Sequence, residues 1–427
     1  MIRSTRAGRA LAVAGVVALA LTACAGGSDD AGDDETAGTG GGEPLLIGTI
    51  LPVTGSLAQL GPPEIAGVDL AVKEINDAGG LFGADVEVEH TDSSDAQNAS
   101  VATASAQQLI SSGVSAIIGA ASSSVTKNIV DDITGAGIVQ VSPANTATDL
   151  SGYSDFYFRT APPDTVQGDV LGNLIVSDGA SNVGILVFND SYGTSLRDVV
   201  EGVVDEAGGS VVYGTSGQEF DPAETNFATI VADAISSGPD ALAILAFTDQ
   251  TPSIVRELVA QGWDMSKTYF VDGNLQNFGV DGDVGFPAGT LENAQGTLPG
   301  AYPSEEFQAR MLEIDPDLKD YSYGPESYDA TMLVALAALK GGASDGATIQ
   351  ANMAAVSGAD GGTECTGWEE CKALIEDGED IAYQAVSGVG PFNEANDPSS
   401  AFIGIYQFGP ENTYTFNRSE EGEVPQG

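Results

Sequence analysis

The feature that most constrains this chain is a repeated alternation of apolar, strand-like runs and helical stretches that begins at residue 45. Residues 45–51 form an apolar run. A Pro-Pro pair at 62–63 then suits a helix start, and Gly79-Gly80 suits its end. Further strands are predicted at 85–89, 114–118 and 138–141, and further helices at 99–111 and 125–134. Strands that alternate with helices predict parallel α/β units.

A second set of the same kind follows an irregular segment at 157–165. Its predicted strands are 183–188, 210–213, 241–246 and 268–271, and its predicted helices are 192–207, 227–236 and 252–261. A chain of 427 residues accommodates two domains of ordinary size. The sequence therefore predicts two similar α/β lobes.

Composition narrows the classes of function. The chain has 62 acidic and 14 basic residues, a formal charge of −48 that repels nucleic acid and anionic membrane surfaces. A single histidine, His90, and three cysteines leave little for metal or nucleophilic chemistry. We therefore expect no metal, no cofactor and no catalytic residues.

The amino-terminal segment predicts export. Three arginines precede an apolar run at 10–20, which is too short for a comfortable membrane span and is followed by Leu-Thr-Ala-Cys ending at Cys24. This ending resembles the bacterial lipoprotein box, which implies a signal peptide at 1–23 and a lipid on Cys24. The alternative is an ordinary signal peptide with an incidental cysteine. Residues 24–43 contain no large apolar side chain and should form a flexible tether.

A serine run follows the predicted strand at 114–118. Ser122, Ser123 and Ser124 stand where a strand ends and a helix can begin, and open α/β sheets bind small ligands at such positions. The positive end of the helix would favour an anion such as a carboxylate. The alternatives are a plain helix cap and a serine hydrolase. Hydrolysis needs a positioned base, but His90 is predicted at a strand end with no evident partner, so we expect no enzyme.

Five motifs carry a family resemblance. They are Leu51-Pro52-Val53-Thr54-Gly55, Ala71-Val72-Lys73-Glu74-Ile75-Asn76 with Gly79-Gly80, Val141-Ser142-Pro143-Ala144, Phe158-Arg159-Thr160-Ala161-Pro162 and Asp190-Ser191-Tyr192-Gly193. From residue 45 to its end, the chain resembles the leucine/branched-chain amino-acid binding protein family. Members are solute-binding components of ABC importers with the type I periplasmic-binding fold.

The resemblance implies an α/β fold of two doubly wound parallel-sheet lobes joined by a three-segment hinge. The implied regions are lobe 1 at 44–162 and 293–385, lobe 2 at 163–292 and 386–417, and an acidic tail at 418–427. The chain should cross between lobes near 159–164, 291–298 and 384–392, and a strand at 402–408 should complete lobe 2.

The resemblance also implies ligand-binding residues. Ser123, flanked by Ser122 and Ser124, takes the position that holds the ligand carboxylate. Ala144 should offer its carbonyl to the ligand ammonium, and Thr146 its hydroxyl and N–H.

From lobe 2, Tyr192 should contact the ligand on closure, unless it is a core tyrosine. Asp272 fits the position that pairs with the ammonium, but a shift of two places would put Asn274 there and favour an amide or another neutral ligand. Leu60 and Phe247 either form an apolar pocket for the ligand side chain or are ordinary packing residues.

Cys365 and Cys371 are predicted to pair as a local disulfide, because the protein is exported and Cys24 carries lipid. The predicted function is capture of a branched-chain or other small amino acid, or a related amide, for ABC permease and ATPase subunits. The protein is expected to act as a monomer held at the outer face of the membrane by its lipid. The alternative is a ligand-sensing receptor subunit of the same fold.

Overall fold

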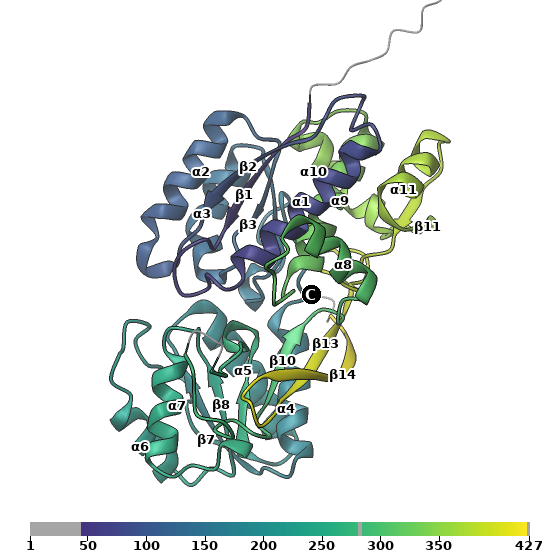
Figure 1. Ribbon diagram of the computed structural model, residues 1–427. Helices are drawn as coiled ribbons and strands as arrows, with labels where there is room; N and C mark the ends of the chain where they lie inside the picture. Colours follow the sequence, from purple (N-terminus) through teal and green to yellow (C-terminus); the bar gives the residue numbers. More distant parts are fainter. Residues whose placement is uncertain (1–43, 281–283, 425–427) are drawn as a thin grey trace, which may run out of the picture. The chain divides into compact units, whose positions relative to one another are not determined.

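The computed structural model describes residues 44–280 and 284–424 of the chain. These residues build two α/β lobes, each organised around its own sheet (Figure 1). The predicted signal peptide, Cys24 and the tether lie outside the described residues.

The first sheet has the strand order β2-β1-β3-β4-β5, and all of its pairings are parallel. Its strands are β1 (Leu46–Leu51), β2 (Glu87–Asp92), β3 (Ala116–Gly119), β4 (Val139–Ser142) and β5 (Tyr157–Arg159). β5 corrects the prediction that the chain is irregular from residue 157. The short 3₁₀ helices η1 (Ala96–Asn98) and η2 (Thr148–Leu150) lie in its loops.

Helices cover both faces of this sheet, as a doubly wound fold requires (Figure 1). One face packs on α2 (Ser100–Ser112) and α3 (Ser123–Gly135), and the other on α1 (Gly61–Asp77), α9 (Gly324–Gly341) and α10 (Gly346–Ser357); α8 (Glu305–Ile314) packs on α1. α1 and α9 approach closely at Gly67, where a Cβ atom would lie 2.2 Å from the carbonyl oxygen of Gly324. This contact fixes the amino end of α9 beside the first lobe.

The second sheet has the order β14-β13-β10-β9-β8-β6-β7. The strands β6 (Asn182–Val187), β7 (Ser210–Tyr213), β8 (Ala241–Leu245), β9 (Thr268–Phe270) and β10 (Gln295–Pro299) are parallel, whereas β13 (Ser400–Phe408) and β14 (Tyr414–Glu423) add an antiparallel hairpin at the edge. The helices of this lobe are α4 (Asp164–Ser177), α5 (Ser191–Glu206), α6 (Ala228–Ser236) and α7 (Thr251–Ala260), with η3 (Met265–Lys267) and η4 (Asp272–Asn274) flanking β9.

The hairpin corrects one predicted boundary. Residues 418–423, predicted to begin an acidic tail, belong to β14 and pair with β13. A second correction concerns residues 295–299, which were predicted to belong to the lobe 1 segment 293–385 but form β10. Because β10 pairs with β9 and β13, it is a lobe 2 strand, and the chain returns to lobe 1 only after Pro299.

A small subdomain packs on the first lobe. It holds α11 (Gly367–Glu376) and the two-stranded sheet of β11 (Thr363–Cys365) and β12 (Ile381–Tyr383). Cys365 and Cys371 form the predicted disulfide, and both are buried beside Trp368. In the part of the chain that the structure describes, no helix is long and apolar enough to cross a bilayer.

Candidate functional site

The serine run lies where the sequence predicts, between the end of β3 and the start of α3. Ser122 caps α3, since its side chain accepts a hydrogen bond from the Val125 N–H at 3.4 Å. The first turn of α3 therefore carries free backbone N–H groups and the positive end of the helix dipole.

Ser123 connects this run to the loop after β4. Its Oγ accepts hydrogen bonds from the N–H groups of Thr146 and Ala147, at 3.3 and 3.2 Å. Because these contacts use the oxygen as acceptor, the hydroxyl hydrogen of Ser123 remains able to donate to another group. The hydroxyl of Thr146 is buried and makes no hydrogen bond of ordinary geometry, although it lies close to the carboxyl group of Asp164. Such buried orphan groups are rare and need an explanation.

The loop that carries Thr146 is held in place by a polar network. Asn145 donates to the Ala120 carbonyl at 3.1 Å and to Thr126 Oγ1 at 2.7 Å, and accepts a hydrogen bond from the Tyr157 hydroxyl. Ser142 also donates to the Ala120 carbonyl, at 2.7 Å. The site on lobe 1 is thus positioned by the carboxyl ends of two neighbouring strands.

Asp272 is the centre of the lobe 2 side. Its carboxyl group accepts hydrogen bonds from Tyr192 Oη at 2.6 Å, Gln167 Nε2 at 2.9 Å and Tyr323 Oη at 2.7 Å. Burial raises the pKa of Asp272, and the hydrogen bonds from the two tyrosines and Gln167 oppose that rise. A cation placed beside this carboxyl group would favour its ionised form.

Asn274 has a different position. Its side chain accepts from the Val271 N–H at 2.9 Å and donates to the Ile244 carbonyl at 2.9 Å and to Thr251 at 3.1 Å. These bonds hold the turn after β9. Asn274 does not line the cavity between the lobes, whereas Asp272 does. Of the two alternatives left open by the sequence, the structure places Asp272 in the site.

One cavity lies between the two halves of this site. Eight of the ten predicted ligand-binding residues line it: Leu60, Ser122, Ser123, Ala144, Thr146, Tyr192, Phe247 and Asp272. The sequence did not single out five other lining residues: Leu57, Ala121, Asn145, Gly273 and Tyr323. Its apolar wall includes the rings of Tyr192 and Phe247, which stack with centroids 5.6 Å apart.

The cavity is narrow because the lobes touch around it. Its volume is about 20 Å³, close to the space that one water molecule needs. Ser124 lies outside the lining and accepts a hydrogen bond from the Ser191 N–H at 3.3 Å, which links α3 to α5. Ser195 of α5 likewise accepts from the Thr148 N–H at 2.9 Å. This is a closed arrangement, and a ligand of amino-acid size requires the lobes to separate.

The amino end of α4 borders the site. The Asp164 N–H donates to the Thr146 carbonyl at 2.7 Å, but neither carboxyl oxygen of Asp164 accepts a hydrogen bond of ordinary geometry. Burial raises the pKa of Asp164 to about 7. The nearby hydroxyls of Ser195 and Thr146 lower it only in part, and the charge of Asp272 raises it further.

Among the described residues, the cavity lining contains no histidine, lysine, arginine or cysteine. His90 does have partners, which corrects the expectation from the sequence: its ring nitrogens lie 2.9 Å from Thr49 Oγ1 and 3.0 Å from Asp69 Oδ1, away from the cavity. Residues 44–280 and 284–424 hold no group of three or more histidine, cysteine, aspartate or glutamate side chains suited to a metal ion.

Two doubly wound lobes with a cavity between them are the architecture of a type I periplasmic binding protein. The profile of the family described as "Periplasmic binding protein" matches residues 44–372, and the chain belongs to this family.

Curated relatives are similar over different shares of their length. The substrate-binding protein BasB of a chemotactic signal transduction system in Halobacterium salinarum is 24% identical over 85% of this chain and 86% of its own. A leucine-, isoleucine-, valine-, threonine- and alanine-binding protein of Pseudomonas aeruginosa is 33% identical, over 37% of this chain and 42% of its own. A Leu/Ile/Val-binding protein homolog of Brucella melitensis is matched over 52% of its length.

Solved structures share the fold. A leucine-binding protein from Thermotoga maritima has a TM-score of 0.72 at 19% identity, covering 88% of this chain and 98% of its own. A branched-chain amino-acid transporter binding protein from Streptococcus pneumoniae, solved with isoleucine, has a TM-score of 0.69 at 22% identity, covering 89% and 100%. A solute-binding protein from R. palustris, solved with 4-hydroxybenzoate, has a TM-score of 0.72 at 17% identity, covering 90% and 98%.

Proposed function

We propose that this protein is the extracytoplasmic, lipid-anchored substrate-binding component of an ABC importer and captures a branched-chain or other small amino acid. One observation carries the ligand class: donor groups on lobe 1 and a buried carboxyl group on lobe 2 line the same cavity. Ser123 and Thr146 would bind the ligand carboxylate, and Asp272 its ammonium. The carbonyl of Ala144 is a second acceptor for that ammonium.

The remaining lining suits an apolar side chain. Leu57, Leu60 and Phe247 are buried and contribute no charge. A closing cleft fits this role because contacts between the lobes, such as Tyr323 to Asp272, form only when the lobes meet. A leucine-sized ligand enters when the lobes separate and then stabilises a closed form that is wider than the arrangement seen here, by its differential affinity for that form.

Calorimetry with three related ligands tests the polar assignments separately. Leucine carries both charged groups, 4-methylpentanoate lacks the ammonium, and isoamylamine lacks the carboxylate. Asp272→Asn should weaken leucine binding roughly 10- to 100-fold, the effect of losing one hydrogen bond to a charged group, and spare 4-methylpentanoate. Ser123→Ala should weaken leucine and 4-methylpentanoate alike and spare isoamylamine.

Asp205→Asn serves as the control, because Asp205 is an exposed residue of α5 away from the cavity. If neither leucine, isoleucine, valine nor small amides raise the melting temperature of the protein, this ligand class is wrong, because a ligand that binds only the native state must stabilise it.

The lipid anchor is tested on Cys24. Growth with an alkyne-labelled fatty acid should label the wild-type protein, and Cys24→Ala should abolish the label and release the protein from the membrane fraction. Equal labelling of both proteins would contradict the anchor.

A receptor function is the second candidate, because a relative that covers most of this chain serves chemotactic signal transduction. Deletion of the gene distinguishes the two. Loss of labelled leucine uptake with normal chemotaxis supports the importer, whereas loss of chemotaxis with normal uptake supports the receptor.

A further inference from the structure

A second and larger cavity lies beside the closed cleft. Its volume is about 470 Å³, within the usual range for small-molecule sites. Leu60 and Tyr323 line both cavities and form the partition between them. Because Leu60 is only 4% exposed and Tyr323 only 1%, the partition is tightly packed. In this closed arrangement the second cavity is distinct from the first, and the two share this wall.

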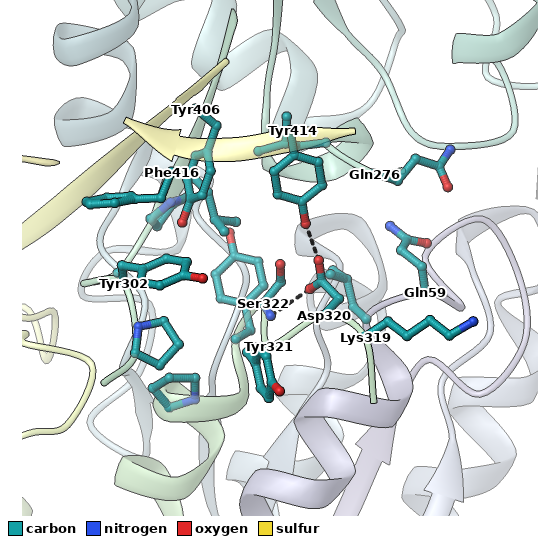
Figure 2. Close-up of a pocket in the computed structure, with 18 of the residues that line it drawn as sticks. Gln59, Gln276, Tyr302, Lys319, Asp320, Tyr321, Ser322, Tyr406, Tyr414 and Phe416 are labelled. Carbon is teal, nitrogen blue, oxygen red and sulfur yellow. Dashed lines mark hydrogen bonds between the residues drawn. The ribbon is translucent and has the colours of Figure 1, made fainter. Parts of the chain in front are cut away.

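Aromatic rings dominate its walls and come from both lobes. Tyr406, Tyr414 and Phe416 belong to the edge hairpin of lobe 2, whereas Tyr302 and Tyr321 lie in segments that flank α8 (Figure 2). Phe416 stacks on Tyr302 with centroids 4.8 Å apart and meets Tyr406 edge-on at 5.7 Å. Tyr302 is 49% exposed and Phe416 38%, so apolar rings reach the solvent at the cavity mouth.

The acidic and basic side chains of the lining are Asp320, Glu326 and Lys319. Asp320 faces the rings, where it accepts hydrogen bonds from the Tyr414 hydroxyl and from the Ser322 N–H (Figure 2). Glu326 also lines the cavity and is 2% exposed. Lys319 is the single basic residue among the lining residues that the structure describes, and its exposed side chain extends away from the tyrosines (Figure 2).

We propose that this cavity is a second ligand site, which takes an organic ammonium ion with an apolar body. Ring faces attract a cation within about 6 Å of their centroids, and the Asp320 carboxylate adds a charge partner. An organic anion is disfavoured by Asp320 and by the formal charge of −48. The volume leaves room for an apolar group that packs against Phe416 and Tyr302.

The site depends on both lobes. The hydrogen bond from Tyr414 on β14 to Asp320, which lies between α8 and α9, spans them. A cation bound here contacts both walls only while the lobes are closed. It should therefore oppose the separation of the lobes that a ligand of the main cleft requires and lower the affinity of the cleft for that ligand, and by linkage the main ligand should lower the affinity for the cation.

Titration calorimetry on the whole protein tests the site with benzyltrimethylammonium as the probe. We expect saturable binding of benzyltrimethylammonium and much weaker binding of phenylacetate, an anion with a similar ring. Phe416→Ala should weaken binding of the cation about fivefold, the effect of losing part of the apolar contact with the ring of the ligand, and Asp320→Asn should also weaken it. Tyr153→Ala, which removes an aromatic ring that is 39% exposed outside the cavity, should not change it.

Leucine is titrated into the same variants, and this separates the second site from the proposed function of the first. Phe416→Ala should leave leucine affinity within about twofold, because Phe416 does not line the cleft. The second site is refuted if the cation does not bind, if Phe416→Ala and Tyr153→Ala behave alike, or if phenylacetate binds as well as the cation. Failure of leucine alone would count only against the proposed amino-acid ligand.

Discussion

Replacement of Asp164 by asparagine should remove part of the pH dependence of stability. Asp164 is fully buried at the first position of α4, and both of its carboxyl oxygens lack a hydrogen-bond partner of ordinary geometry. Burial raises its pKa to about 7 in the folded protein, whereas an aspartate in an unfolded chain titrates near pH 4. Between these values the folded protein binds more protons at this residue than the unfolded chain does.

The sign and size of the effect follow from this difference. Stability from the raised pKa is fully present below about pH 4 and is lost as the pH rises through about 7. Between pH 5 and pH 8, Asp164 should lower the free energy of unfolding of the wild-type protein by roughly 2–3 kcal/mol, since one pKa unit corresponds to about 1.4 kcal/mol. Asparagine does not titrate, so the variant should lack this loss.

Urea unfolding of the ligand-free protein at pH 5 and pH 8 measures the effect as a difference between wild type and variant. Taking the difference matters because other buried acids, such as Glu64, also have raised pKa values. Asp169→Asn is a matched control, since Asp169 lies on the same helix and is exposed. If wild type and Asp164→Asn lose the same stability between the two pH values, Asp164 does not carry the raised pKa.

Three further predictions concern the frame of the site. Arg159→Met should lower the free energy of unfolding by about 3–5 kcal/mol in urea titrations, because it leaves the buried Asp397 without its ion-pair partner at 2.7 Å. Replacing Asp397 in the same variant should restore part of that loss. Cys371→Ser should cost about 2 kcal/mol, and reduction of the wild type should reproduce that loss; an unchanged melting temperature in both would contradict it. Ser195→Ala removes a contact to Thr148 across the closed cleft and should weaken leucine binding by roughly fivefold, with a larger radius of gyration in solution scattering if the open form gains population.

The regular part of the fold was predictable because its signals are local. β8 is a fully buried apolar run, and α5 carries apolar residues at helical spacing on one face. Such patterns depend on a few neighbouring residues and survive without knowledge of the rest of the chain.

The edge hairpin was not predictable in the same way. Most residues of β14 are exposed, and Arg418, Glu420, Glu421 and Glu423 give it the composition of a solvated tail. Charged residues are common on edge strands, where they hinder pairing with other chains. Only the pairing with β13 identifies the segment as a strand, and this pairing cannot be read from the residues of β14 themselves.

The residues of the candidate site also differ in whether local sequence signals point to them. Ser123 follows a strand end and can be found from the sequence, and the family resemblance implies Thr146. Tyr323, the residue before α9, lies about 50 residues beyond Asp272 along the chain. Its signal is weak, a tyrosine before Gly324-Pro325. The choice between Asp272 and Asn274 depends on the turn at η4, which directs one side chain into the cavity and the other under the sheet. Sequence spacing alone does not contain that direction.

The buried pair of Arg159 and Asp397 has a consequence for how the cleft opens. Arg159 ends β5 just before the first crossing, and Asp397 lies just before the third crossing and β13, so the ion pair holds these two segments together on the lobe 1 side. The second crossing is held nearby, where the Ala301 N–H donates to the Ser387 carbonyl at 2.8 Å. Rotation is then confined to the few peptide units between these ties and lobe 2, where Pro162 and Pro163 further restrict the backbone. We therefore expect the lobes to rotate about a short, stiff hinge. Small torsional changes in its few peptide units would then separate the serines of lobe 1 from lobe 2 by a large distance.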